Sequence, residues 1–442
     1  MKNPNSTTAT SVSRRGFLGL TAAAAAVPLL AACGGGSSTG GGSGAGGTVK
    51  FWDMPWGPAA YTEAAKKITE SYAPEGGKAK ATYQSIPWNN YYQSFSSAIA
   101  SKTGPAVSTG AGFQAFQFEE QNQIAYADKV IEELKKNGMF DDFLPGVLEP
   151  FESDKGYIAI PWQLDPRVFW YRKSLFEQAG AELPKDWPTL LEAGKKLKAI
   201  GAFAFGTGAG AGNNIGTQSV VQMLLNNGGG LFTKDGQPDA LNDRNVEAVE
   251  FIRELVSNGI VDPAAVSYNE DSLTSQWKNK KIAFGLHSPG LTQRTGDTSG
   301  DILVGDPLTG PHGDKATLTY GNNIMMYKNT PSQESSEAFV VYYLGQLKEL
   351  WKQGVIGAMP VFKSITELPE FQKDANNVKI IKDWQPISKT FSAQGTRLFA
   401  SLAAVEGGQF LGQFTQTVLG GKTDAKTALQ DLQTGLESVT KK

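Results

Sequence analysis

Flat polar side chains occur at four places where a predicted strand meets a loop, and at two of these places a tryptophan lies beside them. Carboxylate, amide and imidazole groups exchange hydrogen bonds with hydroxyls, and an indole offers a flat apolar surface. A sugar has many hydroxyls and an apolar ring face, so this combination is typical of a carbohydrate-binding site. The structural alternatives are turns or caps for the polar residues and core packing for the tryptophans. The candidates are Asp53, Trp56, Trp162, Gln163, Asp165, His287, Asn322 and Asn323.

Short strands alternating with helices would position these candidates. This alternation predicts α/β layers around a largely parallel sheet, in which ligands bind beyond the carboxyl ends of the strands. Trp187 and Trp277 lie in apolar helical settings and are expected in the core. The expected strands are 48–52, 79–86, 157–161, 202–206, 281–285 and 323–327, and the expected helices are 59–72, 91–100, 190–200, 246–257 and 332–350, with a mostly helical chain from 393 onward.

The sequence patterns of known enzymes occur in this chain only as incomplete matches. His287 and His312 are far apart and have no partnering cysteine, so we expect no metal and no cofactor. Residues 285–290 are close to the G-x-S-x-G pattern of a nucleophile elbow, but the first glycine lies three residues before the serine instead of two. Residues 206–211 satisfy a loose dinucleotide-binding pattern without the acidic residue that should follow it. We therefore expect no catalytic residues and a chemistry of binding without bond breaking.

The first 33 residues have the features of an export signal. Arg14 and Arg15 form a twin-arginine pattern, and the apolar run over 16–32 is shorter than the roughly 20 residues of a membrane span. The run ends in the letters LAAC at Cys33, which resembles a bacterial lipobox. Cys33 would become the first mature residue and carry the lipid that anchors the protein to the membrane. Residues 34–47 are nearly all Gly, Ser, Thr and Ala, which predicts a flexible tether.

Composition and charge narrow the class of protein further. The chain has 442 residues with 41 basic and 43 acidic side chains, and Cys33 is its one cysteine. Removal of the signal would take away three basic side chains and leave a net charge of about −5. Neither a basic stripe for nucleic acid nor a second apolar run for a membrane span is visible. The stretch from Thr48 onward is long enough for two domains or one large one.

Five segments of the chain follow a known family pattern in their order and spacing. The most specific is YIAIP at 157–161, followed by FWYRKSLFEQAG at 169–180. The others are DWPTLLEAGKKL at 186–197, NNGGGLFTKDG at 226–236 and the stretch 242–263. Together they resemble the lipid-anchored solute-binding proteins of ABC importers, in the large sugar-binding group that includes maltose-binding protein. The resemblance covers nearly the whole chain after the tether.

The match also has departures. Ala106 stands where the family usually has an aspartate, and Arg172 and Ser174 replace an asparagine and an aspartate. These differences concern two loops and leave the implied fold unchanged. The loop where the family places polar sugar contacts falls on Phe113 and Gln114. The resemblance therefore adds these two residues to the candidate site.

The resemblance implies two lobes, each a doubly wound and mostly parallel α/β sheet, joined by a hinge. Lobe 1 would comprise 48–161 and 317–361, and lobe 2 would comprise 162–316 and 362–442. The protein would bind a sugar or oligosaccharide between its closing lobes outside the cytoplasm. It would then deliver the solute to the membrane subunits of an ABC permease. A monomer with no affinity for nucleic acid is expected.

Two other functions remain open from the sequence. An exported, lipid-anchored glycosidase or lyase would need two carboxyl groups about 5–10 Å apart, and the chain has many acids. A binding protein for a peptide, polyamine or phosphate ester is the other alternative. An anionic ligand would be favoured if Arg167 and Arg397 faced the cleft.

Overall fold

The computed structural model describes residues 47–88, 91–406 and 408–440. The expected signal over 1–33, with Cys33, and all of the expected tether except Gly47 lie outside the described residues. No helix in the described ranges is both long and apolar enough to cross a membrane.

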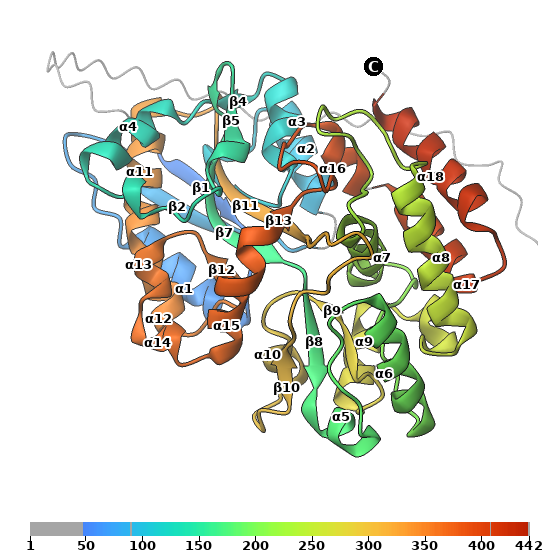
Figure 1. Ribbon diagram of the computed structural model, residues 1–442. Coiled ribbons are helices and arrows are strands. Elements are labelled where there is room, and N and C mark those ends of the chain that lie inside the picture. The colour runs from blue at the N-terminus through green and yellow to red at the C-terminus, as the bar shows by residue number, and fades with distance from the viewer. Residues whose placement is uncertain (1–46, 89–90, 407, 441–442) are drawn as a thin grey trace, which may run out of the picture. The chain divides into compact units, whose positions relative to one another are not determined.

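The large sheet has eight strands and joins segments from distant parts of the sequence (Figure 1). Its main path runs β12-β7-β11-β3-β1-β2, and β4 and β13 also pair with β11. The pairs β1–β2 and β1–β3 are parallel, whereas β11 is antiparallel to both β3 and β7. The strands are β1 Val49–Asp53, β2 Ala81–Ser85, β3 Val107–Gly110, β4 Ile124–Ala125, β7 Ile160–Pro166, β11 Thr317–Tyr327, β12 Met359–Pro360 and β13 Ser388–Lys389.

A second, three-stranded sheet follows directly from the large one. It consists of β8 (Val168–Arg172), β9 (Phe284–His287) and β10 (Ile302–Val304), in the order β10-β8-β9, and both of its pairs are antiparallel. Arg167 alone separates β7 from β8, so the chain passes almost without interruption from one sheet to the other (Figure 1). A short hairpin of β5 (Glu152–Ser153) and β6 (Gly156–Tyr157) precedes β7.

The α/β class is confirmed, but the strand directions are mixed rather than mostly parallel. Parallel neighbours need a crossover connection, usually a helix. Here the chain leaves the large sheet along β7, which continues into β8 of the small sheet. It returns from β10 of the small sheet along β11, so the neighbours β7 and β11 run in opposite directions.

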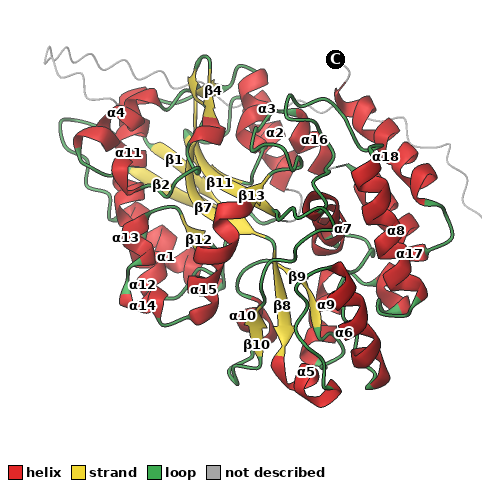
Figure 2. Ribbon diagram, in the orientation of Figure 1, coloured by secondary structure: helices red, strands yellow, loops and turns green. Residues whose placement is uncertain are grey.

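Helices surround the strands of both sheets (Figure 2). Single-turn 3₁₀ helices lie at Phe140–Asp142, Glu149–Phe151, Pro263–Ser267 and Gln385–Ile387, and a π-helical turn lies at Ile380–Trp384. The α-helices are α1 Ala59–Glu70, α2 Tyr91–Ala100, α3 Gln114–Glu120, α4 Asp128–Lys136, α5 Lys173–Ala179, α6 Trp187–Ala199, α7 Asn214–Asn226, α8 Asp243–Ser257, α9 Glu270–Lys278, α10 Leu291–Thr295, α11 Gln333–Gln346, α12 Lys348–Lys352, α13 Lys363–Thr366, α14 Pro369–Gln372, α15 Ala375–Lys379, α16 Ser401–Glu406, α17 Gln409–Gly420 and α18 Ala425–Thr440.

Most amphipathic helices agree with the sequence expectation. The helix expected over 91–100 is α2, and the long helix expected over 332–350 is divided into α11 and α12. Trp187 is a core residue as expected, since it stacks on Phe251 and its Nε1 donates to Asn226 Oδ1 at 2.7 Å. Trp277 is also fully buried.

Helix α7 was not expected from the sequence. All but two of its 13 residues are buried, and even its polar residues Gln218, Gln222 and Asn226 lie inside the protein, so it lacks the exposed polar face of a surface helix. Its N-terminus is set by Asn213, whose side chain accepts a hydrogen bond from the Gly216 N–H at 2.8 Å. The helix contacts β11 and β9 and thereby links the two sheets.

Four expected strands differ from the structure. The strand expected over 281–285 is β9, which begins at 284 and ends at 287. The segment 202–206 forms only isolated bridges, from Phe203 to Ile282 and from Gly206 to Gly285. The strand expected to end at 161 continues as β7 to 166, and the strand expected to begin at 323 begins at 317 as β11. The expectation that Trp162, Gln163, Asp165 and Asn322 lie in loops is therefore wrong, and Asp53 and His287 likewise lie within strands, at the ends of β1 and β9. Polar residues can occupy a strand where their side chains meet a cavity or buried partners.

Candidate functional site

A cavity of about 980 Å³ opens between β7, β11 and the loops and helices around them. Its volume lies at the upper end of the range of about 300–1,000 Å³ that is usual for small-molecule pockets. The aromatic residues of its lining are Trp56, Trp88, Tyr91, Tyr92 and Tyr320, and the polar and charged ones include Gln114, Gln163, Asp165, Arg167, Gln218, Glu270, Arg294, Asn322 and Glu406.

The alternation of β7 decides which of its residues reach the cavity. Successive side chains of a strand point to opposite faces, and Gln163 and Asp165 line the cavity whereas Trp162 and Leu164 do not. Trp162 is fully buried. The same alternation in β11 brings Tyr320 and Asn322 to the cavity, so the two central strands supply its floor.

Two glutamine side chains in the cavity have unused hydrogen-bonding groups. Gln114 and Gln163 are 3% and 1% exposed, and neither the Oε1 nor the Nε2 of either residue has a partner among the described residues. A buried amide without partners costs free energy, and such groups usually have a partner in a native structure. The two amides are therefore placed to exchange hydrogen bonds with a bound polar molecule.

Trp56 is a firmly held flat surface in the lining of the same cavity. Its Nε1 donates to Asp53 Oδ1 and to Thr109 Oγ1, both at 3.1 Å. The indole meets Trp88 edge-to-face with ring centroids 4.8 Å apart and Trp162 edge-to-face at 5.6 Å. Trp162 thus lies behind Trp56 and holds it, while Trp56 itself lines the cavity.

Asp53 lies behind the cavity wall rather than in the lining. Besides the bond from Trp56, its carboxylate accepts hydrogen bonds from Tyr61 (3.0 Å), Tyr83 (3.2 Å) and Thr109 (2.6 Å). Complete burial raises the pKa of Asp53 to about 6, although these hydrogen bonds lower it in part. The residue is hydrogen-bonded to Trp56 and thereby helps to fix the orientation of its indole.

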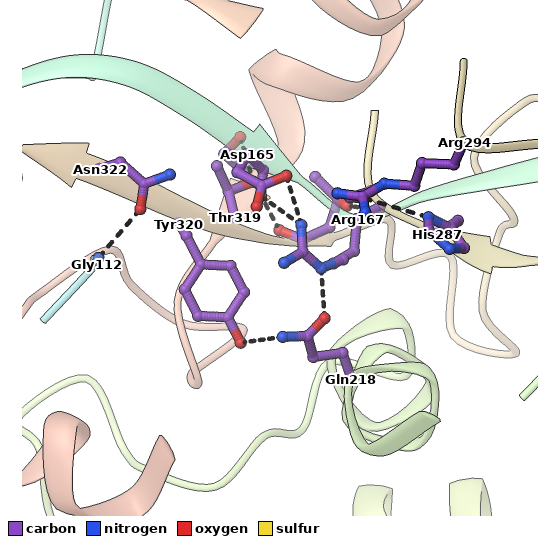
Figure 3. A network of polar contacts seen from close by, with 12 residues as sticks. Gly112, Asp165, Arg167, Gln218, His287, Arg294, Thr319, Tyr320 and Asn322 are labelled. Carbon is purple, nitrogen blue, oxygen red and sulfur yellow. Dashed lines mark hydrogen bonds and ion pairs between the residues drawn. The ribbon is translucent and has the colours of Figure 1, made fainter. Parts of the chain in front are cut away.

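Arg167 lies in the cavity within a network of polar partners (Figure 3). Its Nη1 is 2.6 Å from Asp165 Oδ1, and its Nε donates to Gln218 Oε1. The guanidinium also lies over the Tyr320 ring, 4.9 Å from the centroid, and the Tyr320 hydroxyl accepts from Gln218 Nε2 at 3.1 Å. The charge of Arg167 is therefore paired within the protein.

The other charged groups of the lining are also balanced in part. Arg294 is 3.8 Å from Glu270, so the second arginine of the cavity also has a carboxylate partner. Glu406 is the remaining acid, and burial raises its pKa to about 7 while Arg167 partly lowers it. Arg397 is not part of this lining, and its Nη1 donates to the Asp235 carbonyl at 3.3 Å.

The two expected asparagines connect β11 to the loop after β3. Asn322 lines the cavity, and its Oδ1 accepts from the Gly112 N–H at 3.2 Å (Figure 3). Asn323 is fully buried, and its Nδ2 donates to the Gly112 carbonyl at 3.0 Å. Phe113 is buried behind this loop against Tyr320, with ring centroids 5.8 Å apart. The loop that leads to Gln114, the first residue of α3, is thus held from β11.

His287 is buried beside the cavity and does not line it. Its Nδ1 is 3.2 Å from Ser288 Oγ, and its Nε2 has no partner among the described residues. Burial, together with the nearby charges of Arg294 and Arg167, lowers its pKa to about 3, so the ring is neutral at ordinary pH.

The structure thus divides the sequence candidates into two groups. Trp56, Gln114, Gln163, Asp165 and Asn322 line one cavity. The residues that lie behind its walls are Asp53, Phe113, Trp162, His287 and Asn323.

Sequence reasoning missed other lining residues. Trp88 follows β2 as Trp56 follows β1, so the rule that pointed to Trp56 could have found it. Gln218 and Glu406 lie on α7 and at the end of α16, and no pattern in the sequence connects these helices to the strands. Across the part of the chain that the structure describes, no three His, Cys, Asp or Glu side chains gather as a metal site would require.

Comparison with known proteins defines the class. Residues 55–346 match the family of bacterial extracellular solute-binding proteins, and the chain belongs to this family. It is an extracytoplasmic solute-binding protein of the ABC-transporter type and not an enzyme, as the resemblance implied.

Individual relatives agree with this assignment. A sugar transporter from Arthrobacter chlorophenolicus A6, solved with bound laminaribiose, is 68% identical with a TM-score of 0.83, over 90% of this chain and 100% of that one. Maltose-bound T. maritima MalE3 is 18% identical with a TM-score of 0.70, over 88% and 99% of the two chains, which shows a common two-lobe fold. The sn-glycerol-3-phosphate-binding periplasmic protein UgpB of Brucella abortus (strain 2308) is 24% identical over 84% of this chain and 89% of its own.

Proposed function

We propose that the protein binds a neutral glucan disaccharide of the laminaribiose type in the aromatic cavity and presents it to an ABC permease. The observation that carries this proposal is the pair of buried, unpartnered amides of Gln114 and Gln163 beside the indole of Trp56. The laminaribiose bound to the 68% identical Arthrobacter protein supports a ligand of the same kind here.

The lining offers an aromatic ring for the apolar face of a sugar and amide groups for its hydroxyls. Trp56 is held by Asp53, Thr109 and Trp162, so its ring face can receive a pyranose without a loss of side-chain freedom on binding. The amides of Gln114 and Gln163 can each donate to one hydroxyl and accept from another. Because neither amide has a partner among the described residues, hydrogen bonds to a sugar would satisfy polar groups that are otherwise unpaired.

The charges of the cavity favour a neutral ligand over a phosphate ester. Arg167 is paired with Asp165, and Arg294 is near Glu270. A phosphate would have to displace these carboxylates and would face Glu406 as well. The binding experiment therefore includes sn-glycerol-3-phosphate, the compound in the name of UgpB, as an anionic ligand that we expect not to bind.

Calorimetric titration of the purified protein tests the proposal. We expect laminaribiose to bind with a micromolar or lower Kd, which is about −8 kcal/mol or stronger, and sn-glycerol-3-phosphate to give no heat of binding. Trp56→Ala should weaken laminaribiose binding about 30-fold, as for the loss of an aromatic hot spot of about 2 kcal/mol. Leu183→Ala, an exposed apolar residue outside the cavity, is the control. Full affinity in a folded Trp56→Ala protein would contradict the proposal.

We further propose that the protein is exported by the twin-arginine route, acts as a monomer and is held at the cell membrane by lipid on Cys33. The letters LAAC at Cys33 and the small-residue stretch after it support the anchor. Cys33→Ser should move the protein from the membrane fraction to the soluble or unprocessed fraction, whereas Ser37→Ala in the same stretch should not. A Cys33→Ser protein that stays entirely with the membrane would rule out the lipid anchor.

A further inference from the structure

The charged residues of the cavity lining do not balance. Arg167 is paired with Asp165, and Arg294 lies 3.8 Å from Glu270. The fifth charged residue of the lining, Glu406, has no ion pair and no hydrogen bond within the part of the chain that the structure describes. With three acids against two arginines, the lining carries a charge of −1 when Glu406 is ionised and none when it is protonated.

The groups that face the Glu406 carboxyl do not supply the missing positive charge. Burial raises the pKa of Glu406 to about 7, while Arg167 lowers it and Asp165 raises it. Burial also raises the pKa of the Tyr91 and Tyr320 hydroxyls, and the charge of Glu406 adds to both shifts. The surrounding groups thus come from α2, β7, β11 and the crossing between the sheets, and the cation among them is already paired with Asp165.

The helices around Glu406 do not compensate its charge either. Glu406 is the last residue of α16, and the backbone carbonyls in the last turn of a helix carry partial negative charge. Helices α3 and α18 also pack against α16, and in the described residues none of their charged side chains contributes to the pKa shift of Glu406. The carboxyl therefore depends on water in the cavity to stabilise its ionised form.

We propose that Glu406 takes up a proton from the solvent when the sugar binds, so that the protein captures its ligand more tightly in acidic than in alkaline surroundings. This inference rests on the proposed function. A neutral sugar that fills the cavity displaces water from the carboxyl and brings no charge of its own, and the loss of water disfavours the ionised form. The protonated carboxyl can donate a hydrogen bond to a sugar oxygen, which a carboxylate cannot do.

Calorimetric titration of the complete processed protein with laminaribiose, in two buffers that differ in their heat of ionisation, counts the protons taken up. We expect an uptake of up to about half a proton per sugar at pH 7, because about half of the Glu406 carboxyls are already protonated in the free protein. The affinity should fall about five-fold from pH 7 to pH 9, for a rise of about one unit in the pKa on binding. This range lies above the pKa of Asp53, which is about 6.

Variants of Glu406 assign the proton to this residue. Glu406→Gln should abolish the uptake and give the same laminaribiose affinity at pH 7 and pH 9, because the amide keeps a donor and does not ionise. Glu406→Ala should bind more weakly but also without a dependence on pH in this range. Glu254→Gln removes an exposed acid of α8 outside the cavity and is the control, which should take up protons as the wild-type protein does.

The outcomes separate this inference from the function on which it rests. No heat of binding with laminaribiose at any pH would refute the proposed function, and this inference with it. Binding with no change in protonation, or with release of a proton, would leave the function intact and overturn the inference, because Glu406 would then meet the sugar as a carboxylate or not at all. Undiminished uptake in Glu406→Gln would also overturn it, since the proton would then belong to another group.

Discussion

The Asp53 carboxylate lies behind Trp56 and accepts hydrogen bonds from Trp56, Tyr61, Tyr83 and Thr109. These four donors come from four parts of the chain, so one buried acid fixes the relative positions of the elements that carry them. Burial of a carboxylate still costs free energy, which is why its pKa is raised despite its partners. At the scale of the residue, the cavity wall therefore depends on a buried carboxyl group that does not itself line the cavity.

The raised pKa of Asp53 predicts a pH dependence of stability. In the folded protein Asp53 ionises near pH 6, whereas in the unfolded chain it ionises near the ordinary value of 3.8. Its contribution is therefore complete below pH 3.8 and is lost as the pH rises to about 6, by up to about 3 kcal/mol. Urea unfolding of the wild-type protein and Asp53→Asn at intervals between pH 4 and 7 should show a smaller fall in the free energy of unfolding for the variant.

An exposed acid provides the control for this experiment. Asp154→Asn should keep the pH dependence of the wild-type protein, because Asp154 is exposed. Other groups titrate in the same range, but they are common to all three proteins and cancel in the difference. The same pH slope in wild type and Asp53→Asn would show that the carboxyl is not perturbed as described.

At the scale of elements, glycines allow two segments of the chain to approach closely. Gly206 and Gly285 form a parallel bridge, and a Cβ on Gly285 would lie 2.7 Å from Gly206 Cα. In the same glycine-rich segment, a Cβ on Gly210 would lie 2.4 Å from the Ser267 carbonyl oxygen. The glycines of residues 206–211, which match a loose dinucleotide-binding pattern, are thus explained by the close approach of two backbone segments.

This packing gives a stability prediction for Gly285→Ala. The new methyl group would meet backbone atoms, which cannot move aside as a side chain can, so we expect a loss of about 1–3 kcal/mol in the free energy of unfolding. Gly345→Ala is the matched control, because no atom lies within 4 Å of its Cβ position in α11 and alanine should stabilise the helix by about 0.5–1 kcal/mol. Denaturant unfolding of both variants measures the difference, and equal stabilities would disprove the close approach.

At the scale of the whole molecule, the passage from β7 through Arg167 to β8 joins the two sheets. The Arg167 N–H donates to the Leu318 carbonyl at 2.8 Å, and the Thr317 hydroxyl donates to the Arg167 carbonyl, so β11 is fastened at the same point. Arg167 also contributes to the cavity. We propose that this crossing is part of a hinge between lobe 1 (48–161 with 317–361) and lobe 2 (162–316 with 362–442).

Closure of the lobes around the ligand is the corresponding prediction. A ligand shifts an equilibrium between open and closed forms only by its difference in affinity for the two, and a cavity lined by residues of both proposed lobes would provide that difference. Small-angle scattering with saturating laminaribiose should give a smaller radius of gyration than the free protein. Trp56→Ala at the same sugar concentration is the control. An unchanged radius in the presence of measured binding would contradict closure.

The sequence by itself determined the family, because segments such as 157–161 and 169–180 carry local patterns that do not depend on distant contacts. It also predicted most amphipathic helices, since a buried stripe repeats with the helical period. It did not reveal α7, which is buried on nearly every side and lacks an exposed polar face. It also missed α4, although the buried Val130, Ile131 and Leu134 give that short helix an amphipathic pattern.

Only the tertiary structure decided which polar residues form the site. Gln163 and Trp162 are neighbours in sequence, yet the alternation of β7 sends one to the cavity and the other into the core. Which face of that strand opens to a cavity depends on α7, α16 and the loop 354–358, which come from distant parts of the chain. Side-chain types can therefore indicate the chemistry of binding, but the surface that performs it exists only once these segments are brought together.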